Sequence, residues 1–266
     1  MKEFITRTAT ALVLIVFAYG LIRFVPPVYF SGLLFLLIVT GAVELVKLAE
    51  PKKHSLILII INGLAIALSF TFGKPDLPAA IMITVVFTGI YFLLAVRQQE
   101  LLPHFIRDIG VQFLIVFYLF IPLYYLLELK KLGPHYLFFL IAVIAIGDSF
   151  AYFLGRAFGK HKIYPVASPK KSLEGLIASI VFAALSGWLS IVVFPVQVVV
   201  WKAIVTGGIM GFFSQVSDPI ESLFKRAAGK KDSGALLPGH GGILDRVDSY
   251  IFCAPVLYYI IVYIWK

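Results

Sequence analysis

The chain contains few charged residues and several long stretches with none. Only 14% of its 266 residues are charged, against about 25% in ordinary soluble domains. Hydrophobic residues make up 61% of the sequence. A soluble protein with a very large core is the alternative, but uncharged runs of bilayer-spanning length favour an integral membrane protein.

Cysteine is nearly absent as well. Cys253 stands alone, which excludes an intrachain disulfide and leaves a zinc site without a second thiolate ligand. A convincing cleavage site is also lacking after the apolar run that follows Lys2 and Arg7. We therefore interpret this run as a retained first transmembrane helix and not as a signal peptide.

The apolar runs predict an all-α, polytopic membrane protein with about nine transmembrane helices, because a spanning helix needs about 20 apolar residues. The expected spans are 8–22, 24–43, 55–73, 77–96, 109–127, 134–155, 175–201, 197–224 and 249–265. Only Pro195 indicates a turn between the seventh and eighth of them. We divide this single membrane domain into N-terminal helices (1–130) and a C-terminal region with two polar loops, which we expect to be catalytic (131–266).

Positive charge is unevenly distributed between the two ends of these helices. Most of the 23 Lys and Arg residues fall on the side of the N-terminus, together with both long polar loops. The positive-inside rule then predicts a multi-pass protein of the inner membrane, with its N-terminus and polar loops in the cytoplasm. This distribution explains the net charge of +9 without nucleic acid, which we do not expect as a partner.

The first polar segment begins with Asp148, which lies inside an apolar run. A carboxylate at this depth is costly and is a functional candidate by default. The alternative is a helix-packing or snorkelling residue near the cytoplasmic end. Tyr152 follows four residues later and shares its helix face.

Two adjacent lysines follow in the same segment. Lys170 and Lys171 directly precede a helix that we expect to begin near Ser172, because Ser168 and Pro169 favour a tight approach to it. Cations at a helix N-terminus oppose the helix dipole unless an anion is bound there. We therefore predict an anion site, and the alternative is ordinary positive charge in a cytoplasmic loop.

The second polar segment carries four acids in two pairs. Asp218 and Glu221 share one helix face, and so do Asp245 and Asp248 at the start of the last expected helix. Close carboxylates repel one another without a cation, and oxygen ligands favour Mg²⁺ over zinc. Alternatively, the acids pair with nearby bases, and both arrangements can coexist in a phosphate–metal site. These bases are Lys225, Arg226, Lys231 and Arg246.

Glycines are concentrated between these acid pairs. Gly239, Gly241 and Gly242 precede a helix, and a glycine-rich turn at a helix N-terminus suits phosphate binding. Glycines alone are a weak signal, since loops need them anyway. Combined with the basic clusters and the paired acids, they predict a nucleotide polyphosphate held with a divalent metal.

The second segment resembles the signature of CDP-diacylglycerol synthases, also called phosphatidate cytidylyltransferases. The matching positions are Ser222–Arg226, Lys231–Asp232, Gly234, Leu237–Pro238, His240–Ile243 and Asp245–Asp248. Residues 168–175 resemble a second family segment, in which threonine is commoner than Ser172. The first 130 residues offer only loosely similar hydrophobic helices.

The resemblance implies that CTP and phosphatidic acid react to give CDP-diacylglycerol and pyrophosphate. With it, we expect these catalytic residues: Asp218, Lys225, Arg226, Lys231, Asp232, His240, Asp245, Arg246 and Asp248. We expect these substrate-binding residues: Asp148, Ser168, Lys170, Lys171, Glu174, Gly241 and Gly242. His240 is expected to contact or position phosphate, since an ionised phosphate monoester needs little help from a general base.

The expected cofactor is Mg²⁺. Its expected ligands are Asp218, Asp245 and Asp248, with Glu221 as a second-rank candidate. Whether a monovalent cation such as K⁺ joins the metal stays open. The expected partners are CTP, phosphatidic acid, the lipid bilayer and a second copy of the chain in a homodimer.

Two other function classes are alternatives. An ion-coupled transporter would explain an intramembrane acid and broken helices, but the polar groups gather at one end and no matching halves are seen. A CDP-alcohol phosphotransferase also uses clustered aspartates, but its longer aspartate-rich pattern is absent from this sequence. Dependence on CTP with release of pyrophosphate distinguishes the synthase from both.

Overall fold

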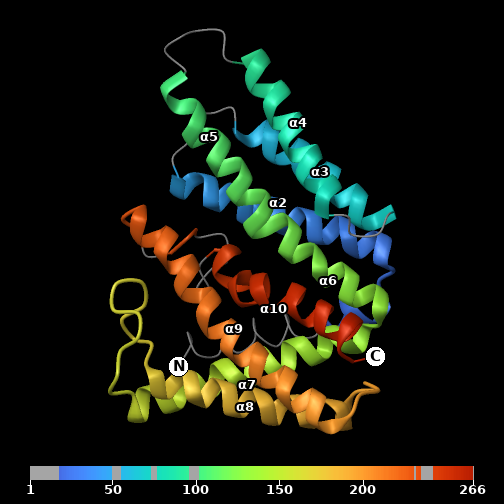
Figure 1. Cartoon of the computed structure of the whole chain (residues 1–266), viewed down its shortest axis with the longest axis vertical. Coiled ribbons are helices and arrows are strands. Elements are labelled where there is room, and N and C mark those ends of the chain that lie inside the picture. The colour runs from blue at the N-terminus through green and yellow to red at the C-terminus, as the bar shows by residue number, and fades with distance from the viewer. Residues whose placement is uncertain are drawn as a thin grey trace, which may run out of the picture.

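The chain folds as a bundle of helices. The computed structural model describes residues 18–49, 55–72, 77–95, 102–230, 232–234 and 242–265. Within these ranges no strand occurs, and the only β-type pairing is an isolated bridge between Lys162 and Ser172. The predicted all-α class is therefore confirmed (Figure 1).

The helices have the following bounds: α2 Pro27–Ala49, α3 Ser55–Phe72, α4 Leu77–Ala95, α5 Leu102–Leu114, the π-helix η2 Ile115–Phe120, α6 Ile121–Leu132, α7 Pro134–Phe158, α8 Leu173–Val193, α9 Val200–Ala227 and α10 Leu244–Tyr263. The longest connections between the helices are 159–172, before α8, and 228–243, before α10. Residues 18–24 are also helical. The turn predicted at Pro195 is confirmed, because α8 ends before it and α9 begins after it.

Several helices have the length and composition of membrane spans. Among the described residues, four helices are long and apolar enough to cross a membrane: Pro27–Ala49, Ile106–Leu132, Pro134–Phe158 and Leu173–Val193. Two shorter apolar helices lie at Ile57–Thr71 and Ile81–Leu94. The protein is thus an all-α, multi-pass membrane protein. Most of the expected span 8–22 lies outside the described residues, and the total of about nine spans stays a prediction.

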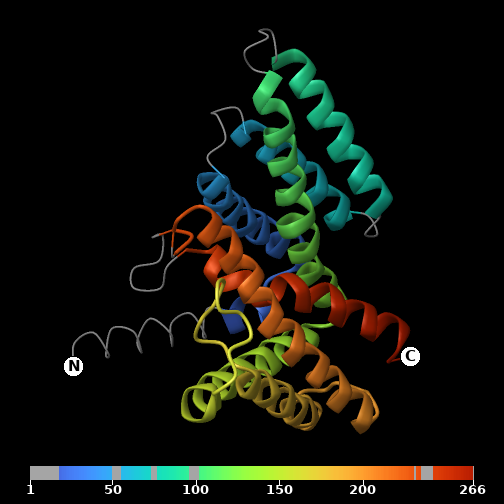
Figure 2. The same ribbon diagram turned by 60° about the vertical axis from the view of Figure 1, so that its left-hand side comes forward.

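Helices α7, α8 and α9 pack side by side at one end of the molecule, and α3, α4 and α5 extend at the other (Figures 1 and 2). Glycine makes the α8–α9 contact close. A Cβ built on Gly187 would lie 2.4 Å from the carbonyl oxygen of Ala203, and one on Gly207 would lie 2.3 Å from that of Ala183. Small residues at such a crossing let two membrane helices touch along their backbones.

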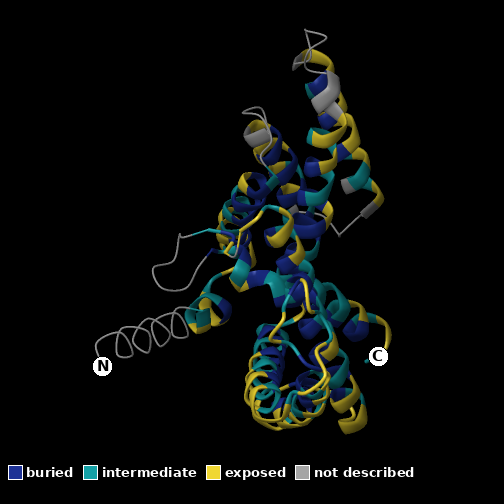
Figure 3. Cartoon of the chain, turned by 90° about the vertical axis from the view of Figure 1, so that its left-hand side faces the viewer, coloured by how far each residue is buried: buried dark blue, intermediate teal, exposed yellow. Residues whose placement is uncertain are grey.

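Helix α10 joins the two ends of the molecule, since it packs against α9, α6 and α2. Buried residues concentrate where these helices cross, and exposed ones cover the outer faces (Figure 3). The ring of Tyr118 from η2 lies edge-on to Phe224 of α9, with 5.2 Å between ring centroids, and to Phe252 of α10. This core fixes the ends of α9 and α10 that carry the acidic residues.

Candidate active site

A cavity of about 860 Å³ lies between α7, the loop before α8, α9 and α10. Its wall includes Asp148, Tyr152, Arg156, Lys162, Ser168, Lys170, Lys171, Gln215, Asp218, Asp245, Asp248 and Ser249. The structure thus brings both polar segments of the sequence to one place. Asp148 and Tyr152 both line the cavity, as their shared helix face predicts.

Three carboxylates meet beside this cavity. Oxygen atoms of Asp218, Glu221 and Asp248 all lie within 4.8 Å of one another. Glu221 is fully buried, and its Oε1 has no hydrogen-bond partner. A buried acceptor without a partner is costly, and three close carboxylates repel one another, so a divalent cation bound here would relieve both penalties. Among the described residues, this acid trio fits such a metal.

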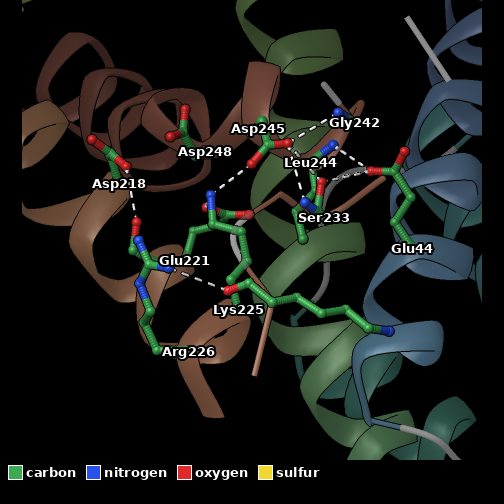
Figure 4. A network of polar contacts seen from close by, with 12 residues as sticks. Glu44, Asp218, Glu221, Lys225, Arg226, Ser233, Gly242, Leu244, Asp245 and Asp248 are labelled. Carbon is green, nitrogen blue, oxygen red and sulfur yellow. Dashed lines mark hydrogen bonds and ion pairs between the residues drawn. The ribbon is translucent and has the colours of Figure 1, made fainter. Parts of the chain in front are cut away.

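Both carboxylate oxygens of Asp245 already accept hydrogen bonds from the protein. Its Oδ1 accepts a hydrogen bond from Lys225 Nζ at 2.6 Å, and its Oδ2 accepts one from the backbone N–H of Gly242 at 2.9 Å. The same lysine also pairs with Glu221 (Figure 4). The alternative in which acids pair with bases therefore holds around Lys225. A metal-ligand role for Asp245 stays a prediction. The carboxylate that lies with those of Asp218 and Asp248 is that of Glu221.

The basic loop before α8 has a defined backbone. Ser172 caps α8, because its side chain accepts a hydrogen bond from the N–H of Gly175 at 3.2 Å. The N–H of Leu173 donates to the carbonyl of His161 at 2.9 Å, which ties the start of the helix to the start of the loop. The predicted helix start near Ser172 is thus confirmed.

Lys171 links the basic loop to the acid trio. Its Nζ lies 2.9 Å from Asp218 Oδ2 and 3.2 Å from the carbonyl oxygen of Gln215. That carbonyl is free to accept because its usual intrahelical donor would be residue 219, and Pro219 has no N–H. Helix α9 continues through this proline, so the proline opens one backbone acceptor without ending the helix.

Asp148 is hydrogen-bonded across to α9. Its Oδ1 accepts from Ser214 Oγ at 2.5 Å and from Gln215 Nε2 at 2.7 Å. These contacts support the helix-packing alternative, while its place in the cavity wall supports a functional role. One residue can serve both purposes, because the hydrogen bonds fix its orientation toward the cavity.

The remaining predicted site residues lie elsewhere. The Glu174 carboxylate pairs with His161 Nδ1 at 2.7 Å and accepts a hydrogen bond from the His161 backbone N–H. Neither residue lines the cavity. Three exposed residues also lie outside that wall: Arg226, Asp232 and Arg246. Lys231, His240 and Gly241 fall outside the described residues.

Sequence analysis missed Glu44 and Ser233. Glu44 on α2 is 5% exposed, and it accepts hydrogen bonds from Ser233 and from the start of α10 (Figure 4). The sequence does contain a signal for it, namely an acid within a mostly apolar helix, the same signal that singled out Asp148. No comparable signal marks Ser233.

Comparison with known proteins decides the family. The sequence profile of the Cytidylyltransferase family matches residues 5–264. The chain belongs to this family. Its cytidylyltransferase relatives include the phosphatidate cytidylyltransferase of Staphylococcus saprophyticus, which is 40% identical over 140 residues, covering 53% of this chain and 54% of that protein.

Two further relatives in the family are similar over the same extent. The phosphatidate cytidylyltransferases of Staphylococcus haemolyticus and Staphylococcus aureus are 39% and 41% identical over 142 and 143 residues. These matches cover 53% of this chain and 55% of each relative. The chain spans about half the length of the curated relatives it matches.

The acid trio predicts where a divalent cation binds. Glu221→Gln keeps the shape of the side chain and removes its charge, so Mn²⁺ affinity measured by electron paramagnetic resonance should fall by about tenfold or more. Glu128→Gln is the matched control, because Glu128 is also buried but pairs with Lys131 on α6. Equal Mn²⁺ affinity in the two variants would show that the trio is not the metal site.

Proposed function

We propose that this protein is a CTP:phosphatidate cytidylyltransferase, which makes CDP-diacylglycerol and pyrophosphate for phospholipid biosynthesis. The observation that carries the proposal is the contact between Lys171 and Asp218. It joins the basic loop before α8 to the acid trio at one cavity of a membrane protein. The names of the relatives point to the same activity.

The cavity has the charges that two phosphate-bearing substrates need. Basic side chains on the α7 side and in the loop can neutralise phosphates, and they are Arg156, Lys162, Lys170 and Lys171. Carboxylates of α9 and α10 line the cavity as well, and Asp148 of α7 adds another. A lipid substrate requires a site next to the bilayer, and helices α7 and α8 that flank this cavity are both long and apolar enough to span it.

The proposed reaction is a nucleotidyl transfer. A phosphate oxygen of phosphatidic acid attacks the α-phosphorus of CTP, and the bond between the α- and β-phosphates breaks to release pyrophosphate. The attacking phosphate is already ionised near neutral pH, since the second pKa of a phosphate monoester is about 6. The residues of the chain therefore mainly align two anions and neutralise their charge.

Within this proposal, Asp218, Glu221 and Asp248 hold the divalent cation. We infer Mg²⁺, which supplies charge neutralisation for the phosphates when it is bound. Lys171 contacts phosphate while it is held by Asp218 and by the Gln215 carbonyl. We also propose that the cavity opens to the cytoplasm, in keeping with the distribution of Lys and Arg. Oligomerisation as a homodimer and an additional K⁺ belong to the proposal as well.

Nucleotide dependence tests the proposed activity. Purified protein in mixed micelles with phosphatidic acid and Mg²⁺ should release pyrophosphate with CTP and little with ATP, GTP or UTP. Omitting phosphatidic acid should abolish release. A transporter would release no pyrophosphate under any of these conditions, and a CDP-alcohol phosphotransferase would consume CDP-diacylglycerol without needing CTP.

Lys171 tests the anion-binding loop. Lys171→Ala should lower turnover by about 100-fold, because it removes a cation aimed at transferring phosphate. The control adds Val166→Lys to Lys171→Ala. Val166 is 75% exposed in the same loop. The added lysine therefore restores the positive charge of the loop, which sets membrane orientation, but not the side chain in the cavity wall. Full activity in this double variant would show that Lys171 acts only through its effect on membrane orientation and does not bind phosphate.

A further inference from the structure

Glu44 reaches the start of α10 from a distant part of the chain. Its Oε1 accepts from the N–H of Ile243 at 3.0 Å, and its Oε2 accepts from the N–H of Leu244 at 2.9 Å. Oε2 also accepts from Ser233 Oγ at 3.1 Å. One buried carboxylate of α2 therefore holds residues on both sides of the glycine-rich segment (Figure 4).

The carboxylate occupies a place where a helix favours an anion. The first N–H groups of a helix lack intrahelical partners, and the helix dipole attracts negative charge there. In this protein the N–H groups of Ile243 and Leu244 donate to Glu44, and that of Gly242 donates to Asp245. The protein's own carboxylates thus bind the N-terminus of α10, where the sequence suggested a phosphate.

Two glycines make room for Glu44. A Cβ built on Gly234 would lie 2.6 Å from Glu44 Oε1, and its three nearest atoms would all belong to Glu44. A Cβ on Gly242 would lie 2.4 Å from Glu44 Oε2 and closer still to Ser233 Oγ. Neither glycine has a left-handed backbone, so close approach of the carboxylate explains these glycines better than turn geometry does.

Ser233 connects Glu44 to the cavity wall. Its Oγ lies 3.1 Å from Glu44 Oε2 and 3.0 Å from Asp245 Oδ2, and its N–H also donates to Asp245. A hydroxyl group has one proton and serves one acceptor at a time. Asp245 in turn binds Lys225, which pairs with Glu221 of the acid trio. The contacts therefore run without a break from α2 to the metal-binding residues.

We infer that Glu44 is a positioning residue for the nucleotidyl transfer, and this inference rests on the proposed function. Glu44 fixes Ser233 and the N-terminus of α10, and through them it sets the orientation of Asp245 and Lys225. Its hydrogen bonds come from Ser233, Ile243 and Leu244, and it does not line the cavity. Helix α2, which lies outside both polar segments of the sequence, thereby supplies a positioning residue to the C-terminal region.

Glu44→Gln tests the inference most sharply. Both carboxylate oxygens accept from backbone N–H groups, so the amide would direct its own N–H groups at one of those donors. Turnover per folded molecule at saturating CTP should fall by about 10- to 100-fold, as for other residues that orient a metal site. The KM for CTP should change less. Glu44→Asp keeps the carboxylate and should recover part of the turnover.

Gly234 provides an independent variant. Gly234→Ala places a methyl group against Glu44 and should lower turnover as Glu44→Ala does. In the double variant the two losses should not multiply, because the methyl group has nothing left to displace. Gly41→Ala is the control on α2, since a Cβ there would lie 4.0 Å from its nearest neighbour, a side-chain atom of Ile243.

The control for buried charge is Glu128→Gln, which should leave turnover near that of the wild type. Wild-type turnover in Glu44→Gln, or multiplying losses in the double variant, would overturn the inference while leaving the proposed function intact. A wild-type protein that releases no pyrophosphate would instead contradict the proposed function. Mn²⁺ affinity, measured on the same samples, needs no turnover and should weaken in Glu44→Gln but not in Glu128→Gln.

Discussion

A buried lysine between two helices holds the centre of the site together. Lys225 of α9 pairs with Glu221 one turn earlier on its own helix and with Asp245 at the start of α10. Removing one partner from such a buried arrangement costs about 3–5 kcal/mol, because an uncompensated charge is left behind. Lys225 thereby links the acid trio to the start of α10, which Glu44 also binds.

The cavity brings acidic and basic side chains close together. The acid trio attracts a cation, whereas the loop before α8 presents lysines that attract anions. Lys171 lies at the boundary, because it contacts Asp218 and a backbone carbonyl that Pro219 leaves free. A phosphate held with a divalent cation satisfies both sides at once, which is why this arrangement suits nucleotidyl transfer better than ion transport.

Local sequence signals predicted much of this structure. Pro195 marks the turn between α8 and α9, and Ser172 caps α8, because both effects depend only on neighbouring backbone groups. The role of Glu44 could not be predicted in the same way. Its partners lie about 200 positions away along the chain, and only the packing of α2 against α10 brings them together. The same limit applies to the acid trio, because only the packing of α10 against α9 brings an oxygen of Asp248 within 4.8 Å of those of Asp218 and Glu221.

The location of metal and nucleotide tests the account most directly. A crystal or cryo-electron microscopy structure of the full chain with Mn²⁺ and a non-hydrolysable CTP analogue would provide it. The account predicts Mn²⁺ between the carboxylates of Asp218, Glu221 and Asp248, with triphosphate oxygens beside Lys171 in the same cavity. Mn²⁺ bound away from these carboxylates, or a triphosphate outside the cavity, would contradict it.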